Sequence, residues 1–143
     1  MARGQDVYDL QRFLEAQSGV YEQACAELRA GRKRSHWMWF VFPQIHGLGS
    51  SPMAVRYAIS SLDEARAYLE HVVLGSRLRE SAGIVVGVQG KTVGEIFGSP
   101  DDMKFHSSMT LFAKAAEGLG DVFEEALAKY FGGAMDQETI RRI

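Results

Sequence analysis

This chain of 143 residues has few of the features that mark secreted, membrane or strongly charged proteins. Its one cysteine, Cys25, cannot form an internal disulfide, which favours a reducing compartment. Its apolar runs are far shorter than the ~20 residues that span a bilayer, and no apolar segment typical of a signal peptide opens the chain. The net charge of −2 disfavours nucleic acid as a partner. We therefore expect a cytoplasmic protein with no membrane partner.

Motifs for metal or phosphate chemistry are also scarce. The four histidines, at positions 36, 46, 71 and 106, form no i/i+3 or i/i+4 pair and have no cysteine partner, whereas a zinc site needs several converging ligands. The glycine-rich segment at 45–52 lacks the Lys-Ser/Thr ending of a phosphate loop. No serine stands in a G-x-S-x-G context. The sequence therefore predicts no metal and no cofactor.

Strand patterns are nearly absent, and helical spacing accounts for most of the chain. Residues 37–42 have the composition of a strand, but no second segment offers a comparable partner, so we expect a short helix ending near residue 40. A Gly/Pro/Ser-rich loop follows near 45–52. The prediction is an all-α fold: one compact domain over residues 1–143, built from seven to nine short helices.

Helix starts are indicated by capping residues. Asp6 is expected to cap a helix over 6–17, and capping-box patterns begin at Ser61 and Thr92. Ser99 with proline at the next position predicts the start of a helix that runs to about residue 117 and ends at Gly118. Further helices are expected over 21–30, 53–59, 77–86, 121–131 and after residue 136.

The segment 35–44 holds both tryptophans and is the first candidate site. Trp37 and Trp39 could stack on a ligand, Gln44 could hydrogen-bond it, and His36 is the candidate catalytic residue because imidazole transfers protons near neutral pH. A block of aromatic residues is more often core, and on a helix the two indoles point about 200° apart, so at least one should be structural. Arg34 lies in a basic run. This run could bind phosphate, or its role could be limited to a favourable interaction with the negative end of a helix dipole.

The second candidate is the polar face of the helix expected over 100–117. Lys104, Ser107 and Ser108 share this face at helical spacing. Serines within a helix usually need a role, which is either a bond to a preceding carbonyl and close helix packing, or a polar wall that binds an anion beside the lysine. The sequence leaves both roles open.

Two functions remain open. In the favoured one, the protein binds a small phosphate-bearing molecule, such as a nucleotide or an ADP-ribose derivative, in a pocket between 35–44 and the 100–117 helix, and could act on it as an enzyme. In the alternative, the protein is a non-catalytic interaction module with an aromatic patch and a basic rim.

Several strings of residues resemble the DUF1810 family of small bacterial proteins. They lie at 31–40, 42–44, 47–49, 96–98, 101–104 and 107–112. The resemblance extends from about Asp9 to Phe131, although Val72 and Ser76 stand where the family commonly has prolines. It implies a compact, mainly helical fold. It carries over no catalytic residue, because the biochemical role of the family is uncharacterised.

Overall fold

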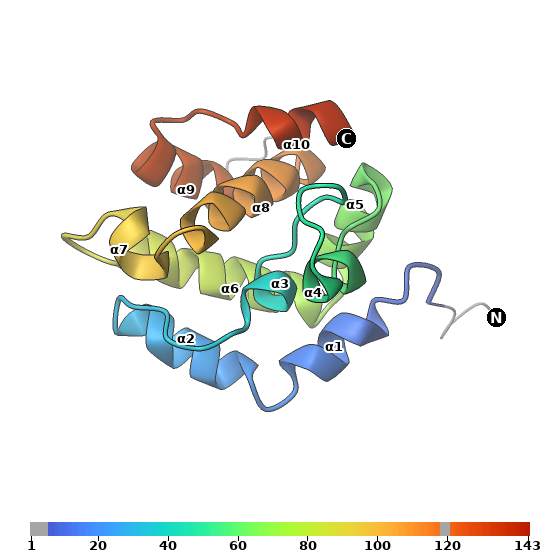
Figure 1. The fold of residues 1–143 in the computed structure, drawn as a ribbon, viewed down its shortest axis with the longest axis horizontal. Coiled ribbons are helices and arrows are strands. Elements are labelled where there is room, and N and C mark those ends of the chain that lie inside the picture. Colours follow the sequence, from blue (N-terminus) through green and yellow to red (C-terminus); the bar gives the residue numbers. More distant parts are fainter. Residues whose placement is uncertain (1–5, 118–120) are drawn as a thin grey trace.

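The computed structural model describes residues 6–117 and 121–143, and within them the chain forms ten helices and no strand (Figure 1). The helices are α1 (Gln11–Gln17), α2 (Tyr21–Arg29), α3 (Met38–Val41), α4 (Pro52–Arg56), α5 (Leu62–Glu70), α6 (Leu74–Gly87), α7 (Val93–Phe97), α8 (Asp101–Ala115), α9 (Val122–Phe131) and α10 (Gln137–Arg142). The all-α prediction is confirmed, with one helix more than the upper expected number.

Most residues expected to cap a helix occupy the N-cap position of that helix in the structure. The Ser61 hydroxyl accepts from the Glu64 N–H, and Thr92 forms a complete capping box with Glu95. Asp121 and Asp136 accept backbone N–H groups at the starts of α9 and α10. These side chains satisfy donors that have no partner within the helix.

Two residues expected to cap helix starts do not do so, and the helix expected from residue 77 already begins at Leu74. Asp6 does not begin a helix, because the chain makes a turn in which Asp9 has φ 53°, and α1 starts only at Gln11. The Asp6 carboxylate still accepts the Leu10 and Gln11 N–H groups at 2.7 and 2.8 Å, across this turn. At α8 the N-cap position belongs to Pro100 rather than Ser99.

The far end of α8 also differs from the expectation. The helix ends at Ala115, two residues before the expected end, and Glu117 has φ 59°. Gly118, the expected stop, lies outside the described residues.

Helix α8 is central and packs against α5, α7, α9 and α10, while α6 packs against α2, α5 and α9 (Figure 1). The core joins α8 to the segment after α3 through aromatic rings. Phe105 of α8 meets Phe42 edge-on at 5.1 Å and stacks on Phe97 at 4.8 Å. Such pairs stabilise beyond the area they bury. They fix the 35–44 segment against the first turns of α8.

The loop after α3 is held at both ends. Ile59 N–H donates to the Gln44 carbonyl and His46 N–H to the Ile59 carbonyl, which forms a single parallel bridge. Gly47 has φ +89°, which favours glycine, and a Cβ there would lie 2.9 Å from Nε of Arg142. Among the described helices, none is both long and apolar enough to cross a bilayer.

Candidate functional site

A buried glutamate shapes the turn that leads into the first candidate segment. Glu27 of α2 is 4% exposed, and its carboxylate accepts from the backbone N–H groups of Arg34 and Ser35 and from the Trp37 indole at 2.7, 3.0 and 2.9 Å. Burial alone would raise the pKa of Glu27, but hydrogen bonds from Ser35, Gln23, the Arg34 backbone and Trp37 together lower this pKa to about 2. The carboxylate is therefore a charged anchor for the turn.

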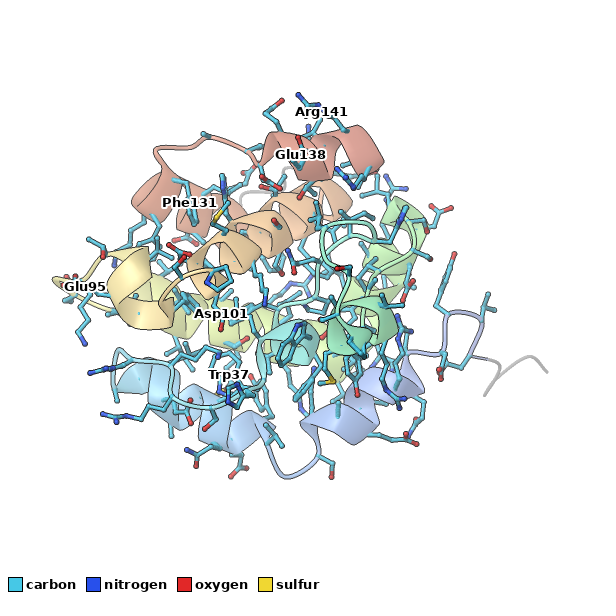
Figure 2. The ribbon with its side chains drawn as sticks, in the orientation of Figure 1. Trp37, Glu95, Asp101, Phe131, Glu138 and Arg141 are labelled. Carbon is cyan, nitrogen blue, oxygen red and sulfur yellow. The ribbon has the colours of Figure 1, made fainter. Side chains whose placement is uncertain are left out.

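A second carboxylate joins this turn to α8. Asp101 accepts from Lys33 at 2.8 Å and from Lys104 at 3.3 Å. The ammonium of Lys33 lies 5.2 Å from the ring centre of Trp37, and that of Lys104 lies 5.0 Å from the ring centre of Trp39. Figure 2 shows Asp101 at the start of α8 and Trp37 beneath it. Two cations thus share one carboxylate between two indoles.

A basic cavity of about 430 Å³ opens beside this cluster. Its walls carry three cationic side chains, Arg32, Lys33 and Lys91. Lys91 is held by a 3.0 Å hydrogen bond from its ammonium to the Gly31 carbonyl. The volume lies within the ~300–1,000 Å³ typical of small-molecule sites.

The one carboxylate that lines the basic cavity, Glu95, already has a structural partner. Its Oε1 accepts the Thr92 N–H at 2.8 Å in the capping box of α7. The Lys33 N–H donates to the Ile96 carbonyl at 2.7 Å, which ties the basic turn to α7. The cavity therefore has an excess of positive charge and firmly held walls.

The structure brings some of the predicted site residues together. Trp39 is half-buried and lies under Lys104 of α8, and with Gln44 it also lines a slot of only about 10 Å³. That slot is about the size of one water. His36 and Arg34 are exposed.

The two predicted serines lie deeper in the fold. Ser107 is buried, and its hydroxyl lies 3.1 Å from both the Met103 carbonyl and the Asp136 carboxylate, which caps α10. Ser108 is fully buried, and its hydroxyl has no hydrogen-bond partner within the described parts of the chain. The contacts of Ser107 therefore match the packing role that the sequence left open.

Lys91 and Asp101 are the site residues that sequence reasoning missed. Asp101 lies in the first turn of a helix, where an acidic residue is common, and only the fold shows that it also pairs with Lys33. Lys91 lines the cavity together with Arg32, although almost 60 residues separate them in the sequence, and no local pattern marks it. In the described ranges, no group of three or more His, Cys, Asp or Glu side chains is placed to hold a metal ion.

Fold and site together define a small all-helical domain with a cationic cavity beside two tryptophans. The chain belongs to the family described as "Protein of unknown function (DUF1810)", whose model matches residues 7–143. It is similar to the conserved hypothetical protein Rv1873 from Mycobacterium tuberculosis, a crystal structure at 1.38 Å, with 60% identity and a TM-score of 0.92 over 95% of this chain and 96% of that one. A comparison with curated proteins gave no match.

Proposed function

We propose that the protein binds a small phosphate-bearing molecule, of the nucleotide or ADP-ribose type, where the 32–44 segment meets α7 and the first turn of α8. The observation that carries this proposal is the cavity lined by Arg32, Lys33 and Lys91, in which the one lining carboxylate is occupied by a capping box. Guanidinium and ammonium groups are the side chains that pair with phosphate.

The aromatic side of the ligand would rest toward Trp39. Lys33 lines the cavity and bonds Asp101, which bonds Lys104 above the Trp39 ring. A chain of ion pairs thus joins the cavity to Trp39, which itself lines the separate slot with Gln44. His36, exposed in the same turn, is the residue that would transfer a proton if the bound molecule reacts.

The interaction-module alternative has less support. An aromatic patch needs exposed rings, but Trp37 is 0% exposed and Phe40 and Phe42 are buried. Only Trp39 of this block is partly accessible. We place the ligand-binding protein in the bacterial cytoplasm, where its free, buried Cys25 would stay reduced.

The test is thermal unfolding in the presence of inorganic phosphate, AMP, ADP and ADP-ribose, at low and high salt. A ligand that binds the native state raises Tm by mass action, and screening by salt should reduce the rise. We expect at least one nucleotide to raise Tm, and Lys91→Ala and Arg32→Ala to reduce that rise. Lys114→Ala, an exposed lysine at the far end of α8, is the control that should leave it unchanged.

The proposal fails if none of these compounds raises Tm, or if the rise is the same in wild type, Lys91→Ala and Arg32→Ala. A nucleotide response lost in His36→Ala but kept in Lys91→Ala would move the site to the exposed face of the 35–44 segment.

A further inference from the structure

A second cavity, of about 810 Å³, lies between the α1–α2 corner and α6, and the function proposed above does not use it. Its walls include Gln17, Tyr21, Cys25, Arg77 and Glu80. Helix α2 packs directly against α6 here, so the walls belong to two elements fixed against each other. The volume is again that of a small-molecule site.

The guanidinium of Arg77 is held in place at this cavity. Its Nη1 donates to Gln17 Oε1 at 3.1 Å, and the group lies 5.2 Å from the ring centre of Tyr21. Gln17 is itself fixed, since its amide donates to the Phe40 carbonyl at 2.7 Å and to the Tyr68 hydroxyl at 3.1 Å. Within residues 6–117 and 121–143, Arg77 makes no ion pair with a carboxylate. A positioned cation of this kind suits a carboxylate ligand.

The opposite charge is present in the same cavity. Glu80 is exposed, and its Oε1 accepts from the Tyr21 hydroxyl at 2.6 Å, which orients the carboxylate. Cys25 is buried in the wall, and burial raises the pKa of its thiol, so it serves as a small apolar surface rather than as a nucleophile.

We propose that this cavity binds a small zwitterion of the free α-amino acid class, with its carboxylate on Arg77 and its ammonium on Glu80. The lining carries two guanidinium groups and two carboxylates, because Arg29 and Glu22 add one charge of each sign at the rim. A lining of balanced charge does not favour a net anion such as phosphate. It matches a ligand that carries both charges, with the Tyr21 ring as an apolar surface for the side chain.

The proposal is tested by titrating the full chain with glycine, L-leucine, L-phenylalanine, L-glutamate and L-arginine, following Tm and backbone NMR shifts. Acetate and methylammonium, which carry one charge each, are the matched probes. We expect at least one amino acid to raise Tm by about 5–10 °C at about 100 times its Kd, and the single-charge probes to have little effect. The NMR shifts should centre on α2 and α6.

Two variants test the charged groups of the cavity while keeping most of the contacts that hold the fold. Glu80→Gln keeps an acceptor for Tyr21 but removes the negative charge, and Arg77→Lys keeps the positive charge but removes the fork. Each should weaken amino-acid binding on the order of tenfold or more. Arg79→Gln on the same helix and Glu125→Gln on α9 are exposed controls that should not change it. The proposal is overturned if no amino acid binds, if acetate binds as well as the amino acids, or if Glu80→Gln binds with wild-type affinity.

Discussion

Trp37 and Trp39 are two residues apart and each has a lysine ammonium close to its ring, at 5.2 and 5.0 Å, yet they lie in different surroundings. Trp37 is wholly buried and donates to Glu27, whereas Trp39 is half-buried and lines a small surface slot. The lysines follow the same order, since the Lys33 side chain is 9% exposed and that of Lys104 is 25% exposed.

The difference follows from where each residue lies at the start of α3. Trp37 is the N-cap, with φ −133° and ψ 5°, whereas Trp39 lies inside the helix, so the two side chains leave the backbone in different directions and only Trp37 is buried completely. Asp101 joins the two sides by bonding both lysines. Similar residue pairs are therefore buried on one side of Asp101 and partly exposed to solvent on the other.

We expect the largest difference in the free energy of unfolding between the alanine variants of the two tryptophans. Trp37→Ala should lower the free energy of unfolding by about 3–5 kcal/mol, because it removes a buried ring and one of the hydrogen-bond donors to the buried Glu27 carboxylate. Trp39→Ala should cost only about 1–2 kcal/mol, because part of its ring already contacts water. Urea unfolding of both variants measures this. Equal losses would show that the two sides do not differ as their burial indicates.

On the buried side, around Trp37, the carboxylate of Glu27 should make the free energy of unfolding depend on pH in the acid range. Its pKa is about 2 in the fold against an ordinary value of 4.5, so its contribution is complete above pH 4.5 and is lost as the pH falls toward 2. This loss should be about 3 kcal/mol. Unfolding measured from pH 6 to pH 2 should show it in wild type and not in Glu27→Gln. If both proteins have the same pH profile, other carboxylates account for the acid sensitivity.

Removal of the Asp101 carboxylate, which bonds both lysines, should have a smaller effect on the free energy of unfolding. Asp101→Asn leaves Lys33, which is almost buried, without its carboxylate, and should cost about 1 kcal/mol. The same change removes a negative charge beside the basic cavity and leaves the charge of Lys33 uncompensated, so affinity for any phosphate-bearing ligand should rise on the order of 3–10-fold. Parallel urea unfolding and ligand titration check the two effects, with Glu125→Gln, an exposed position on α9, as the control. Weaker ligand binding in Asp101→Asn would mean that the carboxylate assists binding rather than competing with it.

The sequence predicted the fold well where the signals were local. Ser61, Thr92 and Asp121 cap their helices as expected, because capping depends on residues within one turn. The prediction for Asp6 was wrong because a turn with positive φ at Asp9 separates it from α1, which begins at Gln11. Such a turn leaves no clear pattern in the residues.

The candidate site could be predicted only in part. Pairing the 35–44 segment with the helix at residue 104 anticipated the Lys104–Trp39 contact, because aromatic and cationic residues marked both segments. The role of Ser107 was left open, because it depends on Asp136, 29 residues later. Lys91 could not be found, since it reaches the cavity only through tertiary contacts, its own hydrogen bond to the Gly31 carbonyl and that of Lys33 N–H to the Ile96 carbonyl.

We expect the smallest effect on the free energy of unfolding at Lys104, which lies on the partly exposed side of the cluster with Trp39. Its ion pair with Asp101 is partly solvated and Asp101 keeps Lys33, so Lys104→Ala should change the free energy of unfolding by at most about 0.5 kcal/mol. Ligand binding should respond more than stability, because the substitution removes a cation above the Trp39 ring. Urea unfolding and nucleotide titration of Lys104→Ala measure the two quantities, and Lys104→Arg, which keeps the charge, should restore binding. A loss of stability larger than that of Asp101→Asn would place Lys104 with the buried side of the cluster rather than with the ligand side.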